Sequence, residues 1–162
     1  MKATSFSTGT RALLLAFSLF MLAPVQAANR SPLPGTITVH SRYGFRTLVQ
    51  RLTQSITANH MVLVARASAS RGAAARGIRI PGNEVLMVFR NDYAVRMLAA
   101  SIPAGIEAPL RLYVTEEPDG TASVTYRRPS AVFAPYGSPK LDAMAAELDP
   151  IFAKIVSDAV GR

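Results

Sequence analysis

The sequence predicts an α+β domain with the element order β-α-β-β-α-β-β-α, in which helices pack on one face of a mainly antiparallel sheet. Three observations lead to this fold class. Five short segments have the apolar alternation or the apolar run of a strand, and three longer segments carry apolar residues at helical spacing. The strands also follow one another in two hairpin-type pairs, which favours an antiparallel sheet with segregated helices.

The first 27 residues have the pattern of a secretory signal peptide. Lys2 and Arg11 precede an apolar run at 12–23, and Val25-Gln26-Ala27 supplies the small residues of a cleavage site after Ala27. This run is shorter than the roughly 20 residues that span a bilayer. We therefore expect cleavage rather than an anchor, no stable membrane span afterwards, and a periplasmic or secreted protein.

The chain after the cleavage site has room for one domain. Residues 28–34 contain two prolines and are expected to form a short extended leader. Residues 35–160 then form a single domain, and the chain has no cysteine. The absence of cysteine excludes thiol chemistry, cysteine zinc sites and iron–sulfur clusters.

The charge is basic and uneven along the chain. Removal of the signal peptide leaves 16 basic residues against 10 acidic ones, and residues 30–111 hold 11 arginines but only 3 acids. An arginine-rich half suits an anionic ligand or an envelope component such as a lipid head group, a wall polymer or an acidic protein, rather than nucleic acid. The alternative is that these arginines only solubilise the surface.

The first strand is expected at Thr36–His40, where Ile37 and Val39 alternate with threonines. A helix follows, with Ser41 as a candidate cap and Asn59 as the left-handed residue that ends it. One face of this helix carries an apolar stripe: Phe45, Leu48, Val49, Leu52 and Ile56.

The second strand is expected at Met61–Ala65. It is nearly all apolar, which is typical of a strand that is central in the sheet or covered on both faces.

The next stretch, Arg66–Gly82, is rich in small residues and arginine and is expected to be an irregular, mobile loop, with one helical turn at Ser70–Arg76 as the alternative. It is also the candidate anion site. Arg71 and Arg76, with backbone amides near the flanking glycines, are donors that grip anions. The spacing matches no phosphate-binding loop.

The third strand is expected at Glu84–Phe89, followed by a helix at Tyr93–Ser101 that Asp92 caps and Pro103 stops. Two further strands form a hairpin. Leu110, Leu112 and Val114 alternate with polar residues in the first, and the second covers Ala122–Tyr126. Pro118-Asp119-Gly120 supplies the turn between them.

The last helix begins at Ser138-Pro139. Its apolar stripe stays nearly in phase across Pro150, which favours one kinked helix over two helices with Asp149 as the second cap. The stripe consists of Leu141, Met144, Leu148, Ile151, Phe152, Ile155 and Ala159.

Several local patterns occur together in this chain: ITVHSRYGFRTLVQRLTQSI with MVLVARA, then VLMVFRND, then GIEAPLRLYVTEEPDGTASVTYRRPS. Through these patterns the chain resembles the domain of unknown function 302 family, which consists of small α+β domains of bacteria and archaea. The resemblance covers about Gly35–Val160. The resemblance implies a strongly curved sheet and leaves pairing as a homodimer open. It implies no activity, because none is established for the family.

The chain departs from the family pattern at two places. Ala67-Ser68 stands where many members carry an Asp-His pair, and Arg90-Asn91-Asp92 stands where many carry Gly-Asn-Pro. Only Asn91 carries over, so any site built on those family positions lacks its imidazole in this chain.

Side chains for catalysis or metal binding are sparse. His40 and His60 are the only histidines, fewer than the three or four ligands of a zinc or copper site, so we expect no metal and no cofactor. No Gly-x-Ser-x-Gly elbow marks a nucleophile. Glu116 and Glu117 belong to a hairpin tip and are interpreted as turn polarity.

Two tyrosines on the hairpin strands form a further candidate. Tyr113 and Tyr126 can share one face of the sheet and line a pocket for a small apolar ligand. The alternative is that both lie at the edge of the core with their hydroxyls in water.

The sequence thus leads first to a non-enzymatic periplasmic binding or interaction module. Its candidate ligand-binding residues are Asn91, Tyr113, Tyr126, Arg71 and Arg76. The alternative is an enzyme acting on a small exported molecule, which requires Asn91, Tyr126 and His40 to converge in one pocket. A homodimer formed through an exposed sheet or helix face is a third hypothesis.

Overall fold

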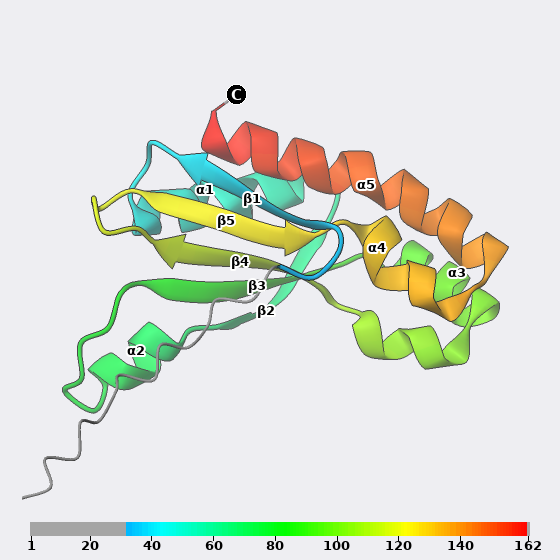
Figure 1. The fold of residues 1–162 in the computed structure, drawn as a ribbon, viewed down its shortest axis with the longest axis horizontal. Helices are drawn as coiled ribbons and strands as arrows, with labels where there is room; N and C mark the ends of the chain where they lie inside the picture. The colour runs from blue at the N-terminus through cyan, green and yellow to red at the C-terminus, as the bar shows by residue number, and fades with distance from the viewer. Residues whose placement is uncertain (1–31, 162) are drawn as a thin grey trace, which may run out of the picture. The chain divides into compact units, whose positions relative to one another are not determined.

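Five strands form one open antiparallel sheet in the computed structural model, which describes residues 32–161 (Figure 1). The order across the sheet is β1-β5-β4-β3-β2, and all four neighbouring pairs are antiparallel. The strands are β1 Thr36–Ser41, β2 Val62–Ala67, β3 Asn83–Phe89, β4 Leu110–Glu116 and β5 Ala122–Arg127. The α+β fold class is confirmed. The signal peptide and the first residues of the leader lie outside the described residues.

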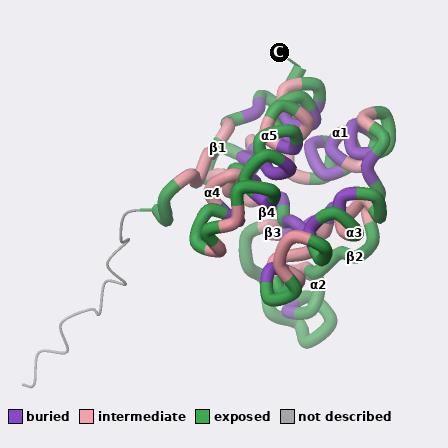
Figure 2. The backbone as a smooth tube through the Cα atoms, turned by 90° about the vertical axis from the view of Figure 1, so that its right-hand side faces the viewer, coloured by how far each residue is buried: buried purple, intermediate pink, exposed green. Residues whose placement is uncertain are grey.

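Two long helices cover one face of the sheet. The helices are α1 Phe45–Ala58, α2 Ala69–Ala74, α3 Asn91–Ala100, α4 Pro129–Phe133 and α5 Pro139–Val160, with 3₁₀ helices η1 Ile102–Glu107 and η2 Ala134–Tyr136. Leu52 of α1 and Phe152 of α5 are buried against inward residues of β4 and β5 in a single core. The buried Ser55 hydroxyl of α1 donates to the Ile155 carbonyl of α5 over 2.9 Å. Figure 2 shows that α1 and α5 alternate between buried and exposed residues along their length.

The strand register divides the residues of each strand between two faces. Leu112 lies opposite Tyr126 and Leu86, and all three point toward the helices and are buried. Tyr113 lies one residue further along β4, so it points to the opposite, uncovered face. An antiparallel sheet that is covered on one face only is a common arrangement.

Strand β2 is the edge of the sheet, and the prediction that it is central or covered on both faces is wrong. Val62 and Val64 are 53% and 47% exposed. The register shifts between Leu63 and Ala65, which marks a β-bulge, a device that discourages further pairing at an edge. Within the run, Leu63 packs against the core, whereas Val62 and Val64 lie partly in solvent.

The left-handed residue at the end of α1 is His60, with φ of 58°, whereas Asn59 has φ of −96°, so the sequence prediction was one residue early. His60 N–H donates to the Thr57 carbonyl and Met61 N–H donates to the Ile56 carbonyl, each over 3.0 Å. These two bonds form a Schellman motif. Met61 and Ile56, which are both buried, occupy the two positions whose hydrophobic contact often accompanies this motif.

The stretch after β2 is more ordered than the sequence predicted. The strand continues to Ala67, and α2 follows immediately, capped by the Ser68 hydroxyl, which accepts from Arg71 N–H over 3.1 Å. Asn83 at the start of β3 accepts from Ala69 N–H over 3.0 Å. The expectation of an irregular loop is therefore wrong for the first half of Arg66–Gly82, because side chains satisfy the first turn of α2.

Two helix starts also differ from their predicted caps, and in α1 the N-terminal flanking residue is Gly44 and not Ser41. Arg90 is the N-terminal flanking residue of α3, and Asp92 lies inside the first turn, where it accepts from the Arg90 guanidinium. α5 is one helix with Pro150 inside it, as predicted. Asp149 accepts from Ser130 N–H over 2.9 Å and Ser130 Oγ over 2.6 Å, so it caps α4 and not a second helix.

Candidate functional site

A groove of about 1210 Å³ runs between α1 and the β2–α2 segment, on the helix side of the sheet. The groove lies over the end of β2 and the start of β3, where Arg66 and Glu84 line it. One wall consists of side chains of α1, and Arg66, Ser70 and Arg71 form the other. Glu84 of β3 and Glu116 of β4 also line it.

Glu84 is a buried carboxylate that two arginines hold. It lies opposite Val114 on the inward face of the sheet and is only 3% exposed. Arg66 Nε donates to Glu84 Oε1, and Arg71 Nη2 lies 3.5 and 3.4 Å from the two carboxylate oxygens. The buried acid therefore orients two guanidinium groups beside the groove.

Most donors of these two arginines remain available. Each guanidinium has five N–H donors. Within residues 32–161, Arg66 engages Glu84 through Nε and Arg71 engages it through Nη2, and no other protein acceptor takes a guanidinium N–H of either residue. Two positive charges face one negative charge, so the cluster keeps a net positive charge. Planar guanidinium donors match the oxygens of a carboxylate or phosphate.

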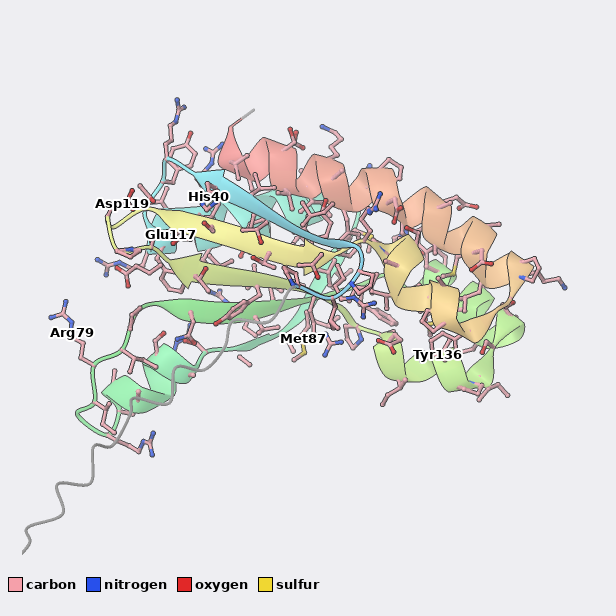
Figure 3. All side chains as sticks on the ribbon, viewed as in Figure 1. His40, Arg79, Met87, Glu117, Asp119 and Tyr136 are labelled. Atoms are coloured by element: carbon pink, nitrogen blue, oxygen red, sulfur yellow. The ribbon has the colours of Figure 1, made fainter. Side chains whose placement is uncertain are left out.

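Other arginines without an acidic partner lie at the same end of the molecule. In the described part of the chain, the Arg46, Arg76 and Arg79 side chains make no hydrogen bond or ion pair, and all three residues are exposed. Arg46 lines the groove, whereas Arg76 and Arg79 lie beyond it on the connection from α2 to β3. Figure 3 shows Arg79 pointing away from the body of the domain.

The groove also has an apolar side. Phe45 packs so closely over Gly82 that a Cβ there would lie 2.8 Å from the ring. Val49 of α1 and the exposed Ile80 also line the groove. Glu116 accepts from Gly82 N–H over 2.6 Å and so holds the β2–β3 connection beside Phe45. The groove is therefore amphipathic, with arginines beside an apolar wall.

The structure brings one of the five predicted ligand-binding residues, Arg71, into the groove; Arg76 follows α2 outside it. Tyr113 is 41% exposed on the uncovered face of the sheet. Tyr126 is buried on the opposite face, with its ring centroid 6.3 Å from that of Phe152. The two tyrosines therefore do not share a face, because Tyr126 pairs with the neighbour of Tyr113.

Sequence reasoning placed Arg66 in the candidate anion segment without naming it as a ligand-binding residue, and it missed Glu84. The available signal was the alternation of β3, in which Glu84 occupies the same face as Leu86 and Val88. A charged residue at an inward strand position requires a partner. What the sequence did not reveal is that the β2 register places Arg66 opposite Leu86, next to that carboxylate.

His40, Asn91 and Tyr126 do not meet in one pocket. His40 lies beside the β4–β5 hairpin, where Figure 3 shows it close to Glu117. Asn91 follows β3 at the opposite end of the sheet. Tyr126 faces the helices and His40 does not. This arrangement lacks the convergence that the enzyme hypothesis requires.

His40 takes part in a polar network that joins two strands. Its Nδ1 lies 2.8 Å from Ser123 Oγ and 3.9 Å from Glu117 Oε1, and Ser123 Oγ donates to Glu117. The Ser123 hydroxyl donates to Glu117, so it is free to accept only from an imidazole nitrogen that carries a proton. Ser123 is 1% exposed. Its hydroxyl is structural, because a nucleophile must reach its substrate.

Neither a metal cluster nor a membrane-spanning helix is found among residues 32–161. No three histidine, aspartate or glutamate side chains in this part of the chain are grouped to hold an ion. No helix there combines the length and the apolar character needed to cross a bilayer.

Comparison with known proteins identifies the fold and the family. The chain is similar to the crystal structure of an uncharacterised conserved DUF302 protein from Bacillus stearothermophilus, with a TM-score of 0.70 and 20% sequence identity, over 78% of this chain and 98% of that one. No curated protein of similar sequence was found. The profile of the family described as domain of unknown function DUF302 matches residues 37–159. The chain therefore belongs to the DUF302 family.

Proposed function

We propose that this protein is an exported, non-enzymatic binding domain that holds an amphipathic anion in the groove between α1 and α2. One observation carries the proposal. The buried Glu84 orients Arg66 and Arg71 while leaving most of their N–H donors open. Donors that are held in place before binding lose less conformational freedom when the ligand arrives.

The two sides of the groove define the chemical class of the ligand. A carboxylate or phosphate group fits the Arg66–Arg71 pair, where charge-assisted hydrogen bonds contribute about 1.5–3 kcal/mol each. An apolar body fits against Phe45, Val49 and Ile80. Ligand pockets for drug-sized molecules have volumes of roughly 300–1,000 Å³. A groove of about 1210 Å³ therefore accommodates a molecule as large as a fatty acid or a lipid head group with part of its chain.

The proposed site of action is the periplasm or the extracellular space. The N-terminal 27 residues have a basic start, a short apolar run and small residues before the cleavage site, and the chain contains no cysteine. An amphipathic anion in that compartment has two chemical sources. It is either a membrane lipid or a free organic acid or phosphate.

Native mass spectrometry of protein purified from the periplasm tests this function and separates the two sources. The wild-type protein should retain an acidic molecule, whose mass distinguishes a lipid from a small acid. The double variant Arg66→Gln/Arg71→Gln should lose it. Arg76→Gln is the matched control, because it removes an exposed arginine outside the groove, and it should retain the molecule. Unliganded protein in all three samples, or a retained neutral molecule, would overturn the proposal.

A further inference from the structure

The end of the domain beyond β3 carries a row of apolar side chains that no other part of residues 32–161 covers. Val95 and Leu98 of α3 point away from the core that Tyr93 and Met97 of the same helix enter. Figure 1 shows α3 at the end of the sheet opposite the β4–β5 hairpin. The row continues into η1 with two isoleucines. The exposed fractions are 60% for Val95, 47% for Leu98, 78% for Ile102 and 81% for Ile106.

These four residues, the α3–η1 stripe, lie close together. Val95 and Leu98 are three apart on a helix and so are neighbours on its surface. Leu98 Cδ2 lies 3.2 Å from the position of a Cβ at Gly105, which places Leu98 against the η1 backbone between Ile102 and Ile106 in sequence. The largest apolar patch on a typical monomer covers roughly 300–600 Å² and is often functional, so four adjacent side chains that are 47–81% exposed form a candidate contact surface.

The charged residues beside the stripe are paired within the chain, so their charges cancel. Arg90 bonds to Asp92 over 2.8 Å, Arg96 bonds to Glu147 over 2.7 Å through two nitrogens, and Arg111 lies 3.9 Å from Glu107. Three arginines and three acids give this rim no net charge, although the whole chain carries +8. This neutrality distinguishes the stripe from the α2 end, where Arg46, Arg76 and Arg79 have no partner among the described residues.

We propose that the α3–η1 stripe is the contact surface of a two-fold homodimer. In such a contact the same patch meets itself, so an apolar centre with a neutral rim of both signs is complementary to its own copy. Two apolar patches of the class found on monomers, roughly 300–600 Å² each, form the centre of such a contact, and their polar rims must supply the rest of the about 1,200–2,000 Å² that stable interfaces bury.

A lipid surface fits the same patch less well. Anionic membranes attract unpaired lysine and arginine, at about 1 kcal/mol for each such residue near the surface. The arginines nearest the stripe, Arg90, Arg96 and Arg111, are all matched by acids. The dimer also leaves the α1–α2 groove open, because α2 and α3 lie at different ends of the sheet (Figure 1).

Analytical ultracentrifugation of the mature chain tests the dimer. We expect a dimer at about 100 μM, a concentration at which a micromolar interaction is saturated. Ile102→Glu and Ile106→Glu should sediment as monomers, and circular dichroism should show them folded, since both side chains are exposed. Val64→Glu, an equally radical change on the exposed edge strand β2, should remain dimeric.

Cysteine cross-linking gives an independent readout, because the chain has no cysteine of its own. Leu98→Cys and Ile102→Cys should each form a covalent dimer with a short bismaleimide, whereas Val64→Cys should not. A monomeric wild type, a dimer that survives Ile102→Glu, or loss of the dimer in Val64→Glu alone would overturn the proposal. So would a monomer that pellets with phosphatidylglycerol vesicles only when Ile102 is intact, which would assign the stripe to a membrane.

Discussion

Arg66 donates from Nε to the carboxylate of Glu84, and this pair joins the edge strand β2 to β3 at the groove. The side chain of Arg66 is 38% exposed, whereas Glu84 is 3% exposed. Arg71, from α2, approaches the same carboxylate from a more exposed position. The contact therefore links the stability of this end of the sheet to the geometry of the candidate site.

The first prediction concerns the stability that this pair supplies. Arg66→Met removes the closest partner of a buried carboxylate and should lower the free energy of unfolding by about 1–2 kcal/mol, less than for a fully buried pair because Arg66 is partly in solvent. The measurement is urea denaturation. The double variant Arg66→Met/Glu84→Met should recover most of the loss, since no buried charge remains and Arg71 is exposed. A double variant less stable than Arg66→Met would show that Arg71 alone is a sufficient partner for the carboxylate.

The second prediction concerns the left-handed residue after α1. A non-glycine residue in that conformation costs roughly 1–2 kcal/mol, and glycine recovers part of this while losing more entropy on folding. His60→Gly should therefore stabilise the protein by about 0.5–1 kcal/mol in thermal or urea unfolding. Asn59→Gly is the matched control. It should destabilise, because Asn59 has a negative φ and its amide donates to Ser55 and Asp158. The opposite ranking would place the left-handed residue at Asn59.

The third prediction concerns the cap that α5 provides for α4. Asp149→Ala removes two hydrogen bonds from Ser130 and should cost about 1–2 kcal/mol, a value typical of a lost helix cap. Asp149→Asn keeps an acceptor oxygen and should cost less. Thermal unfolding of the two variants measures the difference. Equal losses would indicate that the charge of Asp149 matters and the hydrogen bonds do not.

The fourth prediction concerns acid stability. The hydrogen bonds from Arg96 lower the pKa of Glu147 below its ordinary value of 4.5. A depressed pKa in the folded state means that the pair stabilises the fold above about pH 4.5, and that this contribution disappears as the pH falls through the lowered pKa. Wild type and Arg96→Gln should differ slightly in unfolding midpoint at pH 7 and converge in acid. High salt should also reduce the gap, because the pair is exposed. If the difference in unfolding midpoint between wild type and Arg96→Gln were unchanged at low pH, the ion pair would not be the cause of that difference.

The fifth prediction concerns export. Protein recovered from the periplasm after expression with its own N-terminus should have a mass that starts at Ala28. Ala27→Trp places a large residue directly before the cleavage site and should block processing, so that the full-length mass accumulates. A chain that stays in the cytoplasm with its first 27 residues intact would contradict the signal peptide.

The strands and long helices could be predicted from the sequence because their patterns are local. The alternation in β4 and the apolar stripe of α1 depend on neighbours within a few residues. Strand position in the sheet is not local. The apolar segment of β2 resembles a central strand, yet it lies at the edge, because the sheet order depends on pairing between distant segments.

The candidate site was only partly predictable for the same reason. Arg71 lies in an arginine-rich segment and could be named from composition. Arg66 and Glu84 become a pair only when β2 and β3 are in register, with Arg66 opposite Leu86 and therefore beside Glu84. The assignment of Tyr113 and Tyr126 to one face failed by a single residue of register, which reverses the direction of a strand side chain.

The most direct test of the anion groove is a fluorescence titration with anilinonaphthalene sulfonate, an amphipathic anion. The wild-type protein should bind the dye, and added salt should weaken the binding. Arg66→Gln/Arg71→Gln should raise the dissociation constant about tenfold or more, as expected when charge-assisted hydrogen bonds worth at least 1.4 kcal/mol are lost. Arg76→Gln should leave the dissociation constant unchanged. Equal affinity of the wild type and the double variant would contradict the account.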